Sequence, residues 1–306
     1  MLSVIIPAYN EAENIHHARE RLCGVLDQNG IPFELLFVND GSRDDTWARI
    51  VACSKEDPRV RGICFSRNFG KEAAIIAGLR SAKGDCCVVI DCDLQHPPEK
   101  IPEMVEKWRQ GYEVVEGVKR RRGKESRSKR LFARLFYKLL SMSMNMDMEY
   151  SSDFKLLDRK AVDAICALPE KAMFFRALSY WIGYKTTQVT YDVAPRLHGE
   201  TKWSTEKLVG YAIVNLTSFT AKPLLLVIYM GAALLLLALV MGIQTLVRYC
   251  MGRSVEGFTT VILLILLIGG GIMICLGIMG YYLARMYDEI KARPQYLIAR
   301  TTEDEG

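Results

Sequence analysis

Length, composition and charge narrow the class of protein. The chain has 306 residues, of which 50% are hydrophobic, and its formal net charge is +5 at neutral pH. This length can hold one domain of typical size together with membrane-spanning segments. Its 9 cysteines agree with a reducing compartment, and the absence of a CxxC pair or a histidine cluster argues against a zinc site.

Five apolar runs in the first 118 residues have the length and β-branched content of buried strands. Helical stretches separate these runs, and strands that alternate with helices predict a mostly parallel sheet. Ligands of such sheets gather at the carboxyl ends of the strands. We therefore expect the polar residues that follow the strands to share one edge. One run starts at Leu2, and the other four are residues 33–38, 60–65, 86–90 and 113–118.

Asp91 and Asp93 follow the fourth run and are separated by one residue. In an extended chain, residues i and i+2 point the same way, so both carboxylates are expected to face one point. Hard cations such as Mg²⁺ and Mn²⁺ prefer oxygen ligands and bridge to substrate phosphates. The pair predicts a metal–nucleotide site, with an ordinary surface turn as the alternative. Cys92, between the two, is expected to point away from the metal and to pack.

Five segments of the chain together resemble the family-two inverting glycosyltransferases of GT-A fold. With the apolar C-terminal region described below, the chain is similar to the polyprenyl-phosphate branch, which includes bactoprenol glucosyltransferases and dolichol-phosphate mannose synthases. The resemblance covers nearly the whole chain. The segments are residues 4–11 (VIIPAYNE), 39–42 (NDGS), 91–95 (DCDLQ), 152–156 (SDFKL) and 196–203 (RLHGETKW).

This resemblance implies roles for individual residues. Asp153 matches a later family carboxylate near the reacting centre, and Asp153 and Asp93 are the implied catalytic residues. The chain departs from the family pattern at Asn39, which replaces an acid, at Cys92, which replaces a small residue, and at Ser152 and Lys155, which stand where a glycine and an arginine are common. The implied ligands of Mg²⁺ or Mn²⁺ on the diphosphate are Asp91, Asp93 and Gln95. The implied nucleotide-sugar contacts are Pro7, Tyr9, Glu11, Asp40, Lys71 and Asp91.

The segment from Lys119 to Lys138 is strongly basic, because it contains ten lysines and arginines and one acidic residue, Glu125. Leucine and phenylalanine recur beside these charges at helical spacing, which favours an amphipathic helix on an anionic membrane surface. A nucleic-acid arm and a merely solvated helix face are the alternatives, and we expect no nucleic-acid partner. A second interfacial helix is predicted over residues 205–222.

The resemblance gives this part of the chain a role in binding the acceptor. The basic segment would catch the phosphate of the lipid, and a glycine-containing segment after it would form a lid over the phosphates. The implied phosphate-binding and lid residues are Arg122, Arg127, Arg130, Arg196, His198 and Lys202.

Residues 224–247 and 258–284 contain no charged side chain. Each segment exceeds the ~20 apolar residues that cross a bilayer, and core helices of a soluble domain are seldom apolar on all sides for that length. The ten residues between them allow only a tight hairpin. More basic residues flank the outer ends than the hairpin loop, so we expect a multi-pass protein of the cytoplasmic (inner) membrane with its catalytic domain and both termini in the cytoplasm.

The predicted organisation is a nucleotide-sugar-binding half of a GT-A domain (1–118), an acceptor-side half with interfacial helices (119–222), two transmembrane helices (223–284) and a cytoplasmic tail (285–306). We expect inverting transfer of one sugar, from a UDP-sugar, to a polyprenyl phosphate such as undecaprenyl phosphate. The alternatives are a different acceptor or a non-catalytic membrane scaffold of the same fold. The resemblance also implies a homotetramer. No P-loop or QxxRW motif supports a P-loop kinase or a processive polysaccharide synthase.

Overall fold

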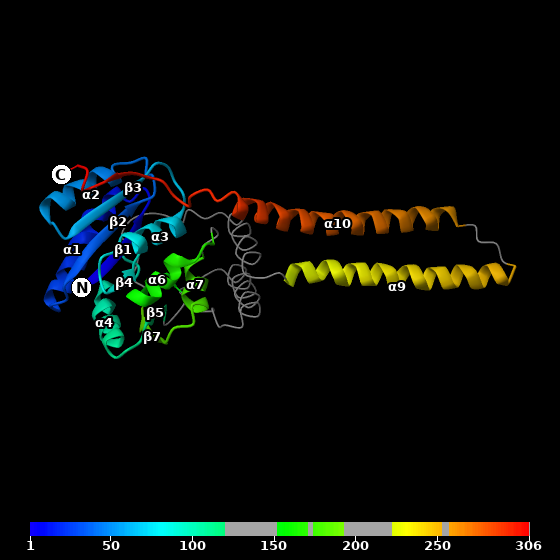
Figure 1. Cartoon of the computed structure of the whole chain (residues 1–306), viewed down its shortest axis with the longest axis horizontal. Helices are drawn as coiled ribbons and strands as arrows, with labels where there is room; N and C mark the ends of the chain where they lie inside the picture. The colour runs from blue at the N-terminus through cyan, green and yellow to red at the C-terminus, as the bar shows by residue number, and fades with distance from the viewer. Residues whose placement is uncertain (120–151, 171–173, 193–221, 253–256, 306) are drawn as a thin grey trace. The chain divides into compact units, whose positions relative to one another are not determined.

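The computed structural model of the chain describes residues 1–119, 152–170, 174–192, 222–252 and 257–305 (Figure 1). Contacts divide the chain into two units. The first unit comprises Met1–Leu208 together with Pro294–Gly306, and the second comprises Val209–Arg293.

Eight strands form one sheet in the described part of the first unit. Their order across the sheet is β7-β5-β6-β4-β1-β2-β3-β8. The first five along the chain match the strands predicted from the sequence, whereas β6, β7 and β8 were not predicted. The strands are β1 (Leu2–Ala8), β2 (Phe33–Asn39), β3 (Val60–Phe65), β4 (Cys86–Val89), β5 (Val114–Lys119), β6 (Lys155–Asp158), β7 (Thr186–Tyr191) and β8 (Ile298–Thr301).

The carboxyl ends of β1, β2 and β4 lie at one edge because these strands are parallel. Ala8 of β1 pairs with Asn39 of β2, and Ile5 of β1 pairs with Val89 of β4. The chain moves outward from β1 through β2 to β3, and then returns to place β4 on the other side of β1. Doubly wound sheets bind their ligands where the strand order reverses in this way. The loops after β1 and β4 therefore flank the expected ligand crevice.

Strand β6 brings residues distant in the sequence to the same edge. It runs antiparallel between β4 and β5, and Lys155 at its start pairs with Val89 at the end of β4. Asp153, two residues before Lys155, consequently lies beside the turn that follows β4. Strands β5 and β7 complete this half of the sheet as a parallel pair.

Helices cover both faces of the sheet because successive strand side chains point to opposite faces. Phe37 of β2 belongs to a core shared with α1, α2 and α4, whereas Val38 packs on the opposite face with α3. A Cβ atom at Gly78 of α3 would lie 2.3 Å from Cγ2 of Ile5, so this close approach requires glycine. The helices are α1 (Ala12–Gln28), α2 (Thr46–Glu56), α3 (Lys71–Ser81), η1 (Pro98–Lys100), α4 (Ile101–Arg109), α6 (Arg159–Ala167) and α7 (Phe175–Trp181).

The segment predicted as a cytoplasmic tail, residues 285–306, contributes a strand to the first unit. Strand β8 pairs antiparallel with the edge strand β3. The Thr302 N–H donates to the Gly62 carbonyl at 3.0 Å, and the Gly62 N–H donates to the Thr302 hydroxyl at 2.9 Å. The Trp47 indole N–H donates to Glu305 at 2.9 Å. This pairing satisfies backbone groups that an open edge would leave exposed.

The second unit contains two long apolar helices, α9 (Lys222–Cys250) and α10 (Phe258–Ile290). The stretches Leu224–Cys250 and Val261–Ile290 are long and apolar enough to cross a membrane. Most of their described leucines and isoleucines are exposed rather than buried, unlike those of a soluble core. The predicted pair of spans is therefore present as helices, and α10 continues six residues beyond the predicted end at residue 284.

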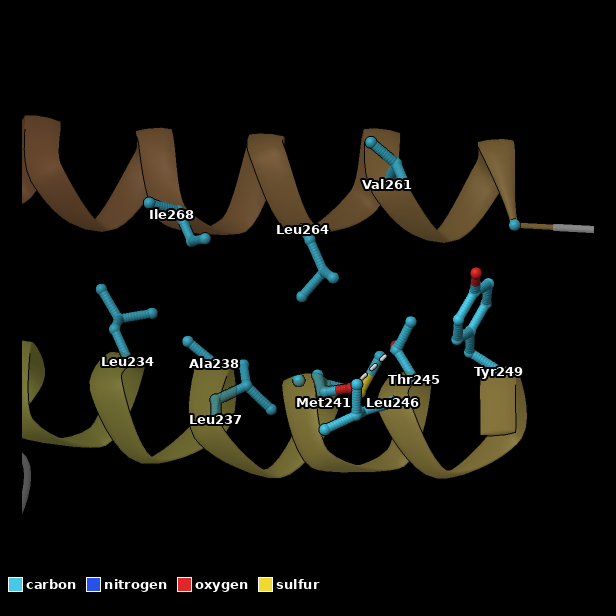
Figure 2. A pocket seen from close by; sticks show the side chains of 12 residues that line it. Leu234, Leu237, Ala238, Met241, Thr245, Leu246, Tyr249, Val261, Leu264 and Ile268 are labelled. Carbon is cyan, nitrogen blue, oxygen red and sulfur yellow. Dashed lines mark hydrogen bonds between the residues drawn. The ribbon is translucent and has the colours of Figure 1, made fainter. Parts of the chain in front are cut away.

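Mostly apolar side chains line a pocket between α9 and α10 (Figure 2). Leu234 of α9 approaches the backbone of α10 so closely that a Cβ atom at Gly271 would lie 2.7 Å from its Cδ1 atom. The Thr245 hydroxyl donates to the Met241 carbonyl of its own helix at 2.8 Å. The Thr245 hydroxyl is thus hydrogen-bonded within its own helix, as a polar group must be where no water is present.

Candidate active site

The loops that follow β1 and β2 interlock at the carboxyl edge of the sheet. The Asn10 N–H donates to the Ser42 hydroxyl at 2.9 Å, and the Arg43 N–H donates to the Asn10 side-chain oxygen at 2.9 Å. Asn10 has a φ of +53°, a left-handed conformation that asparagine tolerates better than most residues. The sequence NDGS therefore acts in part by fixing the loop that carries Tyr9 and Glu11.

The residues predicted to bind the nucleotide share this edge but differ in exposure. Tyr9 is 37% exposed, whereas Pro7 and Glu11 are half-buried. One Glu11 carboxylate oxygen accepts the Asn14 amide N–H at 2.6 Å. Their contact with a nucleotide stays a prediction.

Asp40 has a structural role that the sequence did not reveal. Its side chain is buried, and it accepts the amide of Asn68 at 2.9 Å and the N–H groups of Phe69 and Gly70 at 2.6 and 2.9 Å. Burial raises the pKa of Asp40, against the effect of these hydrogen bonds. The carboxylate thus fixes the loop that leads into α3 and positions Lys71. Its predicted contact with the nucleotide remains a prediction.

Asp91 and Asp93 lie in a turn, not in a continuation of the strand. Strand β4 ends at Val89, the Leu94 N–H donates to the Asp91 carbonyl at 3.2 Å, and Leu94 has a φ of +50°. The expected reason for the shared orientation, an extended chain, is therefore wrong. The side chains of this turn nevertheless alternate in exposure. Asp91, Asp93 and Gln95 are half-buried, whereas Cys92 is 3% exposed and packs in the core.

The donor atoms at this turn fit a hard divalent cation. The two carboxylates and the Gln95 amide offer oxygen ligands, and all three side chains are partly exposed. Mg²⁺ commonly binds one or two carboxylates and completes its coordination shell with water and phosphate. Nδ1 of the buried His96 lies 3.9 Å from Asp91 Oδ2 and has no hydrogen-bond partner in the described part of the chain. Among those same residues, no group of three or more His, Cys, Asp or Glu side chains could hold an ion by itself.

Lys71 and Asp153 complete a compact charged cluster with Asp91. Lys71 Nζ lies 2.5 Å from Asp91 Oδ1 and 2.8 Å from Asp153 Oδ2. On its other side, Asp153 accepts two hydrogen bonds from Arg176, one from Nε at 2.6 Å and one from Nη2 at 2.9 Å. Burial opposes ionisation of Asp153, but Arg176 and Lys71 hold the pKa of its carboxyl well below the ordinary value. Asp153 is therefore a fixed anion.

Glu72, next to Lys71 on α3, stands close to this cluster. Its carboxylate accepts the Phe175 N–H at 2.9 Å. Burial and the nearby Asp153 charge raise the pKa of Glu72 to about 7. The carboxyl of Glu72 therefore changes its charge near neutral pH, whereas that of Asp153 does not.

Arg176 is the site residue that the sequence analysis missed. It belongs to no recognisable motif, and the contacts of α7 with Glu72 and Lys155 bring it to Asp153. Lys155, noted as a departure from the family pattern, is 1% exposed and pairs with the equally buried Glu116 at 3.0 Å. Lys155 thus lies behind the site and not in it.

The predicted phosphate-binding and lid residues lie outside the described residues, as do both predicted interfacial helices. These residues are Arg122, Arg127, Arg130, Arg196, His198 and Lys202.

The sheet topology and the acidic turn at its edge are those of a GT-A fold. This fold is shared with the glucosyl-3-phosphoglycerate synthase of Mycobacterium tuberculosis, solved with Mn²⁺, uridine diphosphate and phosphoglyceric acid. The TM-score is 0.52 at 23% identity, over 71% of this chain and 78% of that one. Residues 3–168 match the family profile "Glycosyl transferase family 2". The chain therefore belongs to glycosyltransferase family 2.

Full-length relatives agree with this membership. The chain is 37% identical to the prophage bactoprenol glucosyl transferase homolog of Escherichia coli, over 98% of both chains. It is 36% identical to the prophage-derived bactoprenol glucosyl transferase of Shigella flexneri, again over 98% of both. It is 40% identical to an uncharacterised glycosyltransferase of Synechocystis, over 97% of this chain and 94% of that one. The predicted family and enzyme class are confirmed.

Proposed function

We propose that this enzyme transfers a single sugar from a UDP-sugar to a polyprenyl phosphate, with inversion, at the cytoplasmic face of a membrane. The match to bactoprenol glucosyl transferases over 98% of both chains carries this proposal, because it includes the two apolar helices as well as the catalytic domain. A transferase acting on a soluble acceptor has no need of two exposed helices of membrane-spanning length.

On the donor side, Asp91, Asp93 and Gln95 would hold Mg²⁺ or Mn²⁺. A cation bound there supplies positive charge to the departing diphosphate, where the reaction develops negative charge. Lys71 would add a second positive charge, since its side chain is 41% exposed and already lies 2.5 Å from Asp91. Tyr9, at the exposed rim of the edge, and Pro7 and Glu11 would contact the nucleotide.

On the acceptor side, no strong base is required. A phosphate monoester has a second pKa near ~6 and is mostly dianionic at neutral pH, so its oxygen is already nucleophilic. Asp153 would orient the sugar or the acceptor, because both of its oxygens accept hydrogen bonds from cations and its pKa is low. In-line attack inverts the anomeric centre, so an α-linked donor would give a β-linked lipid product.

The test is transfer by the purified full-length chain. Labelled nucleotide sugars are incubated with Mn²⁺ or Mg²⁺ and undecaprenyl phosphate, and the lipid extract is analysed for a single added sugar. We expect a lipid-linked product from one UDP-sugar. Hydrolysis of a donor to free labelled sugar, with no labelled lipid, would show an active enzyme and favour a different acceptor. Neither transfer nor hydrolysis of any donor would favour a non-catalytic scaffold.

The proposed topology has a separate test. A single cysteine introduced at Gly252, in the loop after α9, should react with a membrane-impermeant reagent added to intact cells. A cysteine introduced at Glu303 should react only after the cells are opened, because the catalytic domain and both termini would be cytoplasmic. The endogenous cysteines are first replaced by serine or alanine. The reverse labelling pattern would contradict a cytoplasmic active site.

A further inference from the structure

Arg176 lies on α7, beyond the last residue of the segment that matches the family profile, residue 168. Its guanidinium contacts both oxygens of Asp153, at 2.6 and 2.9 Å. The Asp153 side chain is 6% exposed and that of Arg176 is 27% exposed. A bidentate pair of this kind fixes the plane of the carboxylate as well as its charge, because the arginine fork is rigid and planar.

Helix α7 is anchored on two sides, which fixes where Arg176 lies. At its start, the Phe175 N–H donates to Glu72 of α3 at 2.9 Å. One turn later, the Ser179 hydroxyl accepts a hydrogen bond from the buried Lys155 at 2.7 Å. Lys155 is in turn paired with Glu116 of β5 at 3.0 Å. Because Lys155 follows Asp153 by two residues, this buried contact holds the two partners of the Arg176–Asp153 pair at a set separation.

Lys71 cannot fix the Asp153 carboxylate by itself. Its ammonium is shared with Asp91, and a lysine ammonium acts as a point charge on a flexible stem. Loss of Arg176 would leave a buried carboxylate held at only one of its two oxygens by a cation that has another partner. The carboxylate could then rotate, and misplacement of a reacting group by about 1 Å can cost about 100-fold in rate.

We propose that Arg176 is a positioning residue of the transfer reaction, which acts by fixing the Asp153 carboxylate in the plane that the reaction requires. The acceptor used in the test rests on the proposed function. The role assigned to Arg176 does not depend on the acceptor, because it concerns Asp153 alone.

The experiment is a double-mutant cycle in the full-length chain with Arg176→Gln, Asp153→Asn and both together. With UDP-sugar, Mn²⁺ and undecaprenyl phosphate, Arg176→Gln should lower kcat about 100-fold and leave both KM values within about twofold. In the Asp153→Asn background, the same change should alter kcat less than about threefold, since residues that act as a unit are not additive. The kcat of Arg176→Lys should be about tenfold higher than that of Arg176→Gln, because lysine keeps the positive charge but cannot form the bidentate pair.

The matched control is Arg80→Gln on α3, which removes an exposed arginine that contacts Cys166 and Tyr296 and should leave kcat unchanged. An equal loss from Arg176→Gln in both backgrounds would show a direct role and overturn the proposal. A raised KM for the lipid with unchanged kcat would overturn it too, by making Arg176 an acceptor contact. Wild-type kcat in Arg176→Gln would leave the residue no role in the reaction.

A second readout does not depend on activity. Thermal unfolding of the same four chains should show that the two single changes are not additive, because each breaks the same pair. Additive losses in melting temperature would contradict the coupling between Arg176 and Asp153. If the wild-type chain made no lipid-linked sugar, the proposed function would fail, while the cycle could still be measured by donor hydrolysis and by thermal unfolding.

Discussion

Asp93→Asn should lower sugar transfer by at least ~100-fold, the loss expected when one preorganised electrostatic group is removed from a site that stabilises a leaving group. Asp93 is the better of the two turn carboxylates for this test. Asp91 also pairs with Lys71 at 2.5 Å, so Asp91→Asn should cost at least as much but would disturb the charged cluster as well. Initial rates at saturating donor and acceptor measure the effect.

Titration with Mn²⁺ separates loss of metal binding from other causes. If Asp93 holds the cation on the diphosphate, the Asp93→Asn chain should need more Mn²⁺ for half-maximal activity, and a chelator should abolish wild-type activity. Asp163→Asn is the matched control, because Asp163 is exposed on α6 and pairs only loosely with Arg159 at 3.7 Å. Near-normal rates in both Asp91→Asn and Asp93→Asn would remove the metal assignment.

The strands that were predicted and those that were missed differ in a physical way. β1, β2 and β4 are central parallel strands, buried on both faces, and such strands appear in the sequence as continuous apolar runs. β6 and β8 have only four residues each, and the residues of β7 alternate between exposed and less exposed. β8 also follows two apolar helices, so its pairing with β3 depends on contacts between residues far apart in the sequence.

The same distinction separates the parts of the site. The acidic turn, the NDGS loop and Asp153 could be found because each follows or precedes a strand in a recognisable motif. Arg176 has no motif, and its contact with Asp153 depends on the antiparallel pairing of β6 with β4 and on the anchoring of α7 to Glu72 and Lys155. Likewise, the hydrogen bonds that Asp40 accepts from the loop before α3 depend on the register of β2 and β3. Local patterns predict which residues lie at the edge, and packing determines which of them touch.

Replacing Arg122, Arg127 and Arg130 together with glutamine should raise the apparent KM for polyprenyl phosphate and leave the donor KM nearly unchanged. These residues lie outside the described part of the structure, so the prediction rests on the sequence, where ten basic residues between Lys119 and Lys138 face one acid. Each basic residue near an anionic leaflet contributes about 1 kcal/mol. Three removed charges would then cost about 3 kcal/mol, or roughly 100-fold if the contributions add.

A control with the same change in net charge distinguishes a phosphate site from a solvated helix face. Arg49, Arg80 and Arg109 are exposed on α2, α3 and α4, and their joint replacement by glutamine should leave the acceptor KM unchanged. The two apolar helices remain in both triple variants, so loss from the membrane fraction cannot explain a difference between them. The measurement is made at low ionic strength, where surface charges are least screened. Equal acceptor KM values for the two triple variants would show that the basic segment does not gather the lipid phosphate.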